Sequence, residues 1–227
     1  MFFETDEQRM KAFIKLSHIG GSRADYVQGG GGNTSVKLCD GLMAIKASGY
    51  CLKDIELDNG YAVLDGNALR NFYREHNPGD FEDCEAAGAQ CAKENIRILE
   101  GMPALRPSVE AGFHSILKTY VLHTHSVYAN LAACSNQCCD IAAKAFAGAS
   151  YSWGWVPYTD PGANLTFAIR DELRRVEAET GKVPSVILMQ NHGIIAQDDD
   201  ADTCLAIHAD ANERLAKAFG LTGDSFP

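Results

Sequence analysis

The chain has 227 residues, of which 46% are hydrophobic and 22% are charged, as is ordinary for a globular protein. Its 20 basic and 30 acidic residues give a formal charge of −10. This balance argues against non-specific nucleic-acid binding, because phosphate backbones are held by clustered Lys and Arg. It still leaves room for a local site that holds one small anionic substrate.

Targeting and redox features point to the cytoplasm. The opening residues, MFFETDEQRMKAF, lack a basic region followed by an apolar one, so we expect no signal peptide. No apolar stretch approaches the roughly 20 residues of a membrane helix, and we expect no membrane contact. None of the eight cysteines has C-x-x-C spacing, which favours reduced thiols acting as small hydrophobes.

The first half of the chain predicts a helix followed by a hairpin. Apolar residues at helical spacing indicate an opening helix that ends near 20–21. The segment 28-QGGGGNTSVKL-38 passes from a glycine run into an alternating pattern, and 42-LMAIKASGY-50 is a second short apolar run. The Asp40-Gly41 pair between them is typical of a β-turn, so we predict a β-hairpin.

The rest of the chain alternates between the two kinds of element. We predict strands at 61–65, within 119–134, and on both sides of residues 191–193 in 184–197. We predict helices at about 69–74, from 107–108 through 117, at 140–149, at 163–180 and at 199–219. The acidic segment 75–88 indicates an exposed excursion. Without repeats or linker-like breaks, residues 1–227 are expected to form a single α/β domain.

Two histidines lie one alternation apart in the apolar segment 119-TYVLHTHSVYANLAAC-134. On a strand, residues i and i+2 point to the same face, so His123 and His125 project together. Two imidazoles placed in this way can supply two of the ligands of a metal site. A lone histidine on an apolar strand is more often a hydrogen-bonded core residue, and the spacing alone does not decide between the two.

Two further residues favour the metal. His192 lies between apolar strands in 190-QNHGII-195, and Glu110 follows the expected helix start in 106-RPSVEAGFH-114. Three histidines and a carboxylate suit tetrahedral zinc, although nickel, cobalt or manganese would also accept them. A competing interpretation takes Glu110 and His114 as the ligand pair, because they are four residues apart on one face of the expected helix. We rank His114 lower, as a supporting or core residue.

The glycine run suggests an anion site. Four glycines let backbone N–H groups approach a ligand closely, and Asn33 adds side-chain donors. The run matches neither the P-loop nor the dinucleotide fingerprint, and a flexible turn is the alternative. Ser48, Gly49 and Ser108 offer further donors, the last at an expected helix N-terminus. Together these residues indicate a small phosphate pocket made from loops.

Five motifs, in the order GGGGNTSVK, IKASG, RPSVEAGFH, VLHTHS and QNHGII, resemble the class II aldolase/adducin N-terminal-domain family. The resemblance covers roughly residues 8–215. The family includes L-fuculose-1-phosphate and L-rhamnulose-1-phosphate aldolases and L-ribulose-5-phosphate 4-epimerase. It implies a three-layer α/β/α domain around a largely antiparallel sheet, and a homotetramer with active sites at subunit interfaces.

The resemblance also implies roles for particular residues. A divalent metal, usually zinc and one per chain, would be held by His123, His125 and His192, with Glu110 as fourth ligand or catalytic acid/base. The substrate phosphate would contact Gly32, Asn33, Ser48, Gly49 and Ser108. The aldolases often have two serines before the glutamate, whereas this chain has Ser108-Val109, so one phosphate donor is missing. Lys37 and Lys46 are either cationic replacements or exposed strand lysines.

The implied reaction is retro-aldol cleavage of a ketose phosphate to dihydroxyacetone phosphate and an aldehyde. A metal stabilises the negative charge left by the broken C–C bond, and Glu110 would move the proton at carbon. A tyrosine from a neighbouring subunit often serves as second acid, for which Tyr151 and Tyr158 are loose candidates. A 4-epimerase, a dehydratase or a decarboxylase would use the same site. A non-catalytic adducin-like module would lack ligands, and here all four are present.

Overall fold

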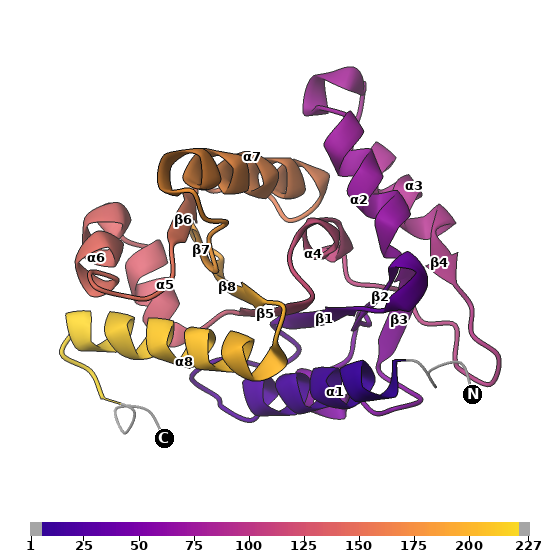
Figure 1. Cartoon of the computed structure of the whole chain (residues 1–227), viewed down its shortest axis with the longest axis horizontal. Helices are drawn as coiled ribbons and strands as arrows, with labels where there is room; N and C mark the ends of the chain where they lie inside the picture. The colour runs from indigo at the N-terminus through magenta and orange to yellow at the C-terminus, as the bar shows by residue number, and fades with distance from the viewer. Residues whose placement is uncertain (1–5, 223–227) are drawn as a thin grey trace.

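The computed structural model describes residues 6–222. Within this range one eight-stranded sheet has the order β4-β3-β2-β1-β5-β8-β7-β6. Neighbouring strands are antiparallel except β6 and β7, which are parallel. Figure 1 shows α1 and α8 on one face of the sheet and α2, α4 and α7 on the other. The predicted layered α/β fold with a largely antiparallel sheet is confirmed.

The elements have the following bounds. The strands are β1 (Asn33–Lys37), β2 (Leu42–Lys46), β3 (Tyr61–Asp65), β4 (Ile96–Arg97), β5 (Tyr120–Thr124), β6 (Trp153–Val156), β7 (Val186–Met189) and β8 (Gly193–Asp198). The α-helices are α1 (Glu7–Gly21), α2 (Gly66–Glu75), α3 (Cys84–Glu94), α4 (Ala111–Ile116), α5 (Val127–Ala133), α6 (Cys138–Ala145), α7 (Ala163–Thr180) and α8 (Ala201–Ala218).

Strand β5 lies near the middle of the sheet, and its five residues are all buried. Successive side chains of a strand point to opposite faces. Leu122 accordingly packs with the apolar residues of α1, while Val121 packs with Phe113 of α4 and Ile169 of α7. His123 shares the face of Val121 and meets the edge of the Phe113 ring. The core therefore fixes the side of the sheet on which His123 appears.

Short polar side chains start several of the helices. Asp65 accepts a hydrogen bond from the N–H of Ala68 at the start of α2, and Asp200 accepts one from the N–H of Thr203 at the start of α8. Such caps satisfy backbone donors that the helix itself leaves free. In the β1–β2 hairpin, Asp40 and Gly41 adopt φ angles of 55° and 76°, as the predicted turn requires.

Several sequence predictions differ from the structure. The helix expected to run from 107–108 through 117 is only the six-residue α4, so Ser108 lies before a helix rather than at its N-terminus. Residues 84–88 of the expected excursion belong to α3. The segment 119–134 divides into β5 and α5. Strands β4 and β6 were not predicted, because short edge strands carry little periodic signal.

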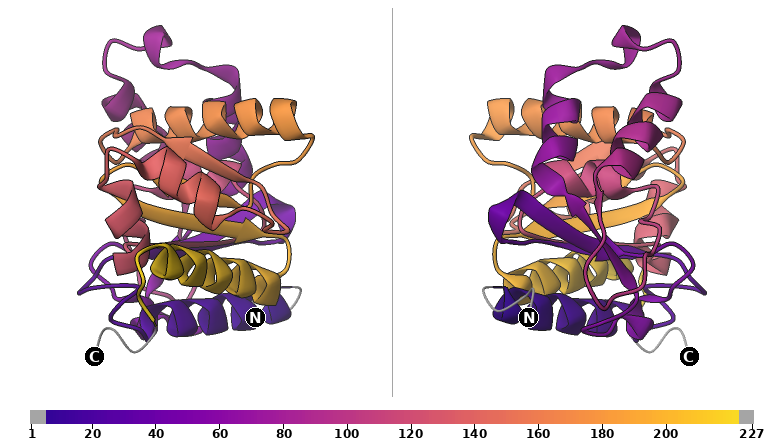
Figure 2. Two further views of the ribbon diagram at one scale, coloured as in Figure 1. Left: turned by 90° about the vertical axis from the view of Figure 1, so that its left-hand side faces the viewer. Right: turned by 90° about the vertical axis from the view of Figure 1, so that its right-hand side faces the viewer.

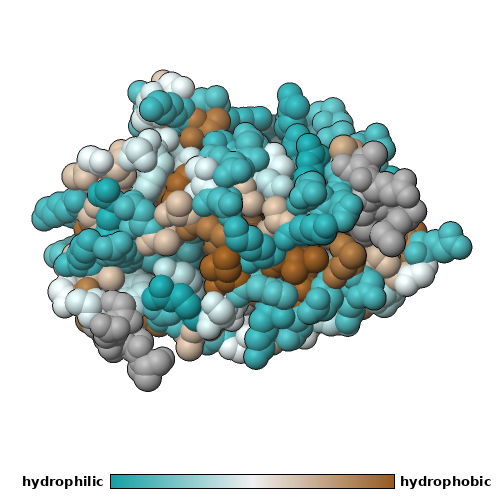
Figure 3. All heavy atoms as spheres, turned by 60° about the horizontal axis from the view of Figure 1, so that its bottom comes forward, coloured by the Kyte–Doolittle hydropathy of each residue, from teal (hydrophilic) through white to brown (hydrophobic). Residues whose placement is uncertain are grey.

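The outer face of α1 and α8 is mixed in character. The two helices lie side by side beneath the sheet in the views of Figure 2. Figure 3 shows hydrophobic side chains gathered in the middle of this face, with hydrophilic ones around them. Of the helices in residues 6–222, none combines the length and the apolar character that a bilayer crossing requires.

Truncating Leu122 should test the core beneath the site. Leu122 is fully buried, so Leu122→Ala should lower the free energy of unfolding by about 2–5 kcal/mol through lost burial and the cavity left behind. Urea denaturation measures this value. The control Leu131→Ala, at a residue that is 40% exposed, should change it by less than about 0.5 kcal/mol. Equal effects would contradict the assigned packing.

Candidate metal centre

Four side chains from separate parts of the chain converge on one face of the sheet. Glu110 is the residue that precedes α4, His123 lies in β5, and His125 follows the end of β5. Because β5 pairs with β8, the β7–β8 turn that carries His192 is brought beside them. One ligand atom from each of the four lies within 4.8 Å of the others. The histidines expected from the sequence therefore meet at a candidate metal site.

The spacing of these atoms suits a tetrahedral ion. Nε2 of His123 is 3.2 Å from Nε2 of His125. Oε1 of Glu110 is 3.4 Å from Nε2 of His123 and 3.2 Å from Nε2 of His192. Ligands bound at about 2.0–2.1 Å in a tetrahedron lie about 3.3 Å apart. The donor set is thus consistent with a divalent metal.

Hydrogen bonding favours the tautomer that a metal needs. Nδ1 of His123 lies 3.0 Å from the carbonyl oxygen of Ile194, where it can only donate. A neutral His123 then carries its lone pair on Nε2, toward the other ligands. Nδ1 of His192 is buried and has no hydrogen-bond partner among the described residues, so its orientation comes from packing of the turn.

The protonation states of Glu110 and His125 suit metal ligands. Burial raises the pKa of the Glu110 carboxyl, but in the metal-free site the charge of a protonated His123 and the hydrogen bonds from His123 and His192 outweigh it and hold that pKa well below its usual range. A bound divalent ion would take the place of those imidazole protons. Burial, with the nearby imidazoles of His123 and His192, lowers the pKa of His125 to about 4. At neutral pH the site therefore presents an ionised carboxylate and a neutral His125, as metal binding requires.

His114 lies outside this cluster. Its side chain is fully buried, stacks on Phe113, and shares a 2.7 Å hydrogen bond between Nδ1 and the Ser35 hydroxyl. Burial lowers its pKa well below the usual range. Its position behind Glu110 corresponds to a core residue.

The glycine run forms the wall next to His125. A Cβ added to Gly31 would lie 3.1 Å from Nδ1 of His125, and one added to Gly32 would lie 2.9 Å from the carbonyl oxygen of His123. Gly32 also has a φ of 74°, which disfavours other residues. The next residue, Asn33, donates from Nδ2 to Oε2 of Glu110 at 3.2 Å. Asn33 therefore orients the carboxylate directly.

The other residues predicted to contact phosphate lie on two adjoining segments. Ala47 and Pro107 form an isolated antiparallel bridge, and the N–H of Ser48 donates to the carbonyl of Arg106. The Ser108 hydroxyl accepts the N–H of Glu110 at 3.3 Å. Ser48, Gly49 and Ser108 are thus held close together on these paired segments. Whether they bind phosphate stays a prediction.

The two lysines differ from the exposed strand lysines considered above. Lys46 is 4% exposed, and its ammonium group donates to the carbonyls of Gly30 and Tyr50. Burial lowers its pKa, against the opposing charge of Glu110. It ties the glycine run to the turn after Gly49. Lys37 instead donates to the carbonyl of His114.

Neither candidate tyrosine reaches the cluster through a hydrogen bond. The Tyr151 hydroxyl donates to Asp210 on α8, and the Tyr158 hydroxyl donates to Asp160 in an exposed loop. Next to His125, a cavity of about 490 Å³ extends along α5 to Cys134 and Ser135. This cavity gives a small molecule access to His125.

Sequence patterns did not single out Arg106, and they did not indicate the burial of Lys46. Arg106, in the RPSVE motif, donates from its guanidinium to the Ser48 hydroxyl at 3.0 Å. Lys46, in the IKASG motif, was noted but not expected to be buried. Their proximity to the predicted anion-binding residues was the available signal. It depends on the bridge between Ala47 and Pro107, which no local pattern reveals.

Comparison with solved structures shows similar folds at low sequence identity. A class II aldolase domain from Thermoplasma acidophilum has a TM-score of 0.75 and 21% identity, with 94% of each chain covered. YgbL from Klebsiella pneumoniae, named as a candidate aldolase, epimerase or decarboxylase, has a TM-score of 0.63 and 16% identity, with 96% of this chain and 91% of that chain covered. L-fuculose-1-phosphate aldolase from Thermus thermophilus has a TM-score of 0.53 and 12% identity, with 97% and 99% covered.

Sequence comparison identifies the family. No curated protein sequence matches the chain. The family model described as Class II Aldolase and Adducin N-terminal domain matches residues 13–219. Because that match spans nearly the whole chain, and the folds agree, the chain belongs to the class II aldolase and adducin N-terminal domain family.

Proposed function

We propose that the protein is a metal-dependent aldolase that cleaves a ketose phosphate to dihydroxyacetone phosphate and an aldehyde. The observation that carries this proposal is the convergence of Glu110 with three histidines beside an open cavity. Membership of the family and the fold shared with L-fuculose-1-phosphate aldolase support it.

His123, His125 and His192 would hold the metal, and a set of three imidazoles suits zinc. A bound divalent ion supplies Lewis-acid polarisation of the substrate carbonyl. The three side chains are anchored by the sheet and by the β7–β8 turn, so they need little rearrangement to bind. Rigid placement of the ligands lowers the ordering cost of binding.

Glu110 is suited to moving the proton at the carbon next to the carbonyl. Its Oε1 faces His123 and His192, while Oε2 accepts the amide N–H of Asn33. Glu110 is 8% exposed, which excludes most water from competing for the proton. An ionised carboxylate held in one orientation is what a general base at carbon requires.

Other reactions of the same site remain alternatives. A 4-epimerase, a dehydratase or a decarboxylase would use the same four residues, and YgbL, with a similar fold, is named for two of these activities. A panel of C4 to C6 sugar phosphates, assayed with the zinc-loaded protein, separates these reactions by their products. A non-catalytic module is disfavoured, because it has no need for four converging ligands.

A homotetramer is part of the proposal. Among the described residues, both candidate tyrosines donate to aspartates of their own chain, so the second acid supplied by a neighbouring subunit would be another group. Hydrophobic side chains gathered on the α1–α8 face also suit a contact between chains (Figure 3).

Removing a ligand should remove the metal. We expect about one divalent ion per chain, and His192→Ala should lower this to a small fraction because the three-imidazole set is broken. Elemental analysis after dialysis measures the content. His76→Ala, at a surface histidine paired with Asp80, is the matched control and should keep full metal content. Full occupancy in His192→Ala would show the ligand set to be wrong.

Replacing the carboxylate should separate metal binding from proton transfer. Glu110→Gln should keep most of its metal on three histidines, yet lose roughly 10²–10⁴-fold in exchange of a carbon-bound proton of dihydroxyacetone phosphate into deuterated water. Nuclear magnetic resonance follows the exchange without an aldehyde partner. Glu177→Gln, at an exposed position of α7, should exchange like the wild type.

The exchange rate of Glu110→Gln shows whether Glu110 is the base that moves the proton at carbon. Undiminished exchange in metal-loaded Glu110→Gln would give the base role to another group. Absence of exchange in the wild type would instead favour a dehydratase or decarboxylase that does not use this substrate.

Assembly can be measured separately. Light scattering at micromolar concentration should give a mass about four times the chain mass of 24.6 kDa. A mass of one chain would contradict the tetramer and, with it, any catalytic group supplied by a neighbouring subunit.

A further inference from the structure

We propose that Arg106 supplies the positive charge of the substrate-anion site and gives this site its preference for a phosphorylated substrate. The substrate class rests on the proposed function. Anion binding itself can be measured without turnover, so the two can fail independently.

The backbone holds Arg106 beside the predicted anion-binding turn. The N–H of Ser48 donates to the carbonyl oxygen of Arg106 at 2.9 Å, next to the bridge between Ala47 and Pro107. These contacts involve only main-chain atoms. The guanidinium then reaches the Ser48 hydroxyl at 3.0 Å. Substitution of the side chain therefore leaves the link between the two segments in place.

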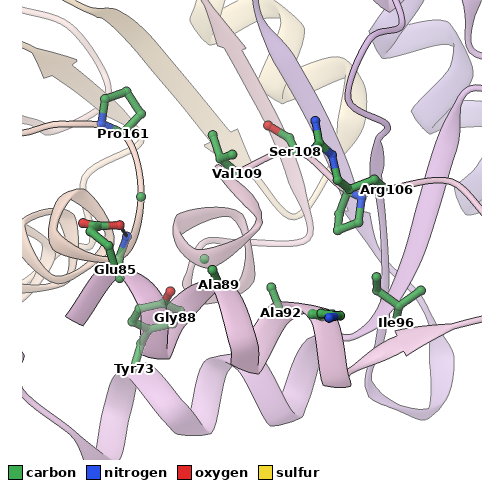
Figure 4. A pocket seen from close by; sticks show the side chains of 15 residues that line it. Tyr73, Glu85, Gly88, Ala89, Ala92, Ile96, Arg106, Ser108, Val109 and Pro161 are labelled. Carbon is green, nitrogen blue, oxygen red and sulfur yellow. Dashed lines mark hydrogen bonds between the residues drawn. The ribbon is translucent and has the colours of Figure 1, made fainter. Parts of the chain in front are cut away.

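Several hydrogen-bond donors around Ser48 and Ser108 have no acceptor within the described residues. The Ser48 hydroxyl accepts from Arg106, and the Ser108 hydroxyl accepts from the N–H of Glu110, so each keeps its own proton to donate. Within residues 6–222 the N–H of Gly49 has no hydrogen-bond partner. Figure 4 shows the side chains of Arg106 and Ser108 pointing to the same side, away from Ala89 of α3. Free donors beside a cation form an anion site.

The charge of Arg106 is not neutralised inside the described chain. Arg106 forms no ion pair there, although it lines a cavity of about 570 Å³ together with Lys93 and Glu85. The Glu85 carboxylate is engaged elsewhere, since it accepts the N–H groups of Ala163 and Asn164 at the start of α7. The exposed guanidinium is therefore free to meet an anionic ligand at the Ser48 hydroxyl.

Arg106 also replaces the phosphate donor that is missing at Val109, where the family pattern has a second serine. The Val109 side chain is 70% exposed and has no donor where a second serine was expected. Neither lysine is as well placed, because Lys37 donates to the carbonyl of His114 and Lys46 to two carbonyls of the flanking loops. A guanidinium offers five N–H donors in one plane, which match two phosphate oxygens at once.

The test is binding of inorganic phosphate to the metal-loaded protein, measured by calorimetry. Arg106→Met should weaken binding by roughly 10- to 100-fold, since a hydrogen bond to a charged group is lost. Arg106→Lys should recover part of this loss, because it restores charge without the planar fork. Arg174→Met removes one exposed arginine from α7 and should leave phosphate affinity unchanged.

Kinetics supply a readout that a structural role would not move. Arg106→Met should raise KM for a sugar phosphate by a similar factor, with kcat and the KM of the unphosphorylated analogue nearly unchanged. Metal content and melting temperature should stay at wild-type values. Equal weakening for both substrates, phosphate affinity unaffected by Arg106→Met, or a wild type that does not bind phosphate would each overturn the proposal. Phosphate binding that depends on Arg106 without cleavage of any sugar phosphate would refute only the aldolase.

Discussion

The carboxylate of Glu110 is buried among three imidazoles, and much of the surrounding structure serves to keep it there. An isolated buried carboxylate would be strongly destabilising, so it must be paired or must bind a metal. Its partners, His123, His192 and Asn33, come from β5, the β7–β8 turn and β1. Their convergence depends on the register of β5 against β1 and β8. A one-residue slip of β5 would turn His123 to the opposite face.

The short helix α4 links Glu110 to strand β1 and to helix α2. It begins directly after Glu110, and its last carbonyls, those of His114 and Ser115, accept hydrogen bonds from Lys37 and Arg70. Cations at a helix C-terminus complement its dipole and satisfy carbonyls that have no partner within the helix. Six residues carry little intrinsic helical stability, so α4 holds Glu110 in place through these contacts and through Phe113 in the core.

Features that follow from local periodicity could be predicted from the sequence, whereas features that depend on contacts between distant segments could not. His123 and His125 were predicted to project together because a strand repeats every two residues, and β3 was predicted with its observed bounds. The length of α4 could not be predicted, since residues up to Leu117 continue an apolar pattern that the return into β5 interrupts. Burial of Lys46 likewise follows from two loops closing over it.

The centre divides into two parts with different physical origins. The candidate metal-binding part is built on the sheet, where packing of β5 and β8 fixes the imidazoles and tolerates little change. The predicted anion-binding part is built from two irregular segments joined by the bridge between Ala47 and Pro107. Loops accept substitutions, such as Val109 in place of a serine, at small cost to the fold. In this chain, the proposed role of Arg106 therefore places the preference for a phosphorylated substrate on the irregular segments, apart from the residues of the candidate metal centre.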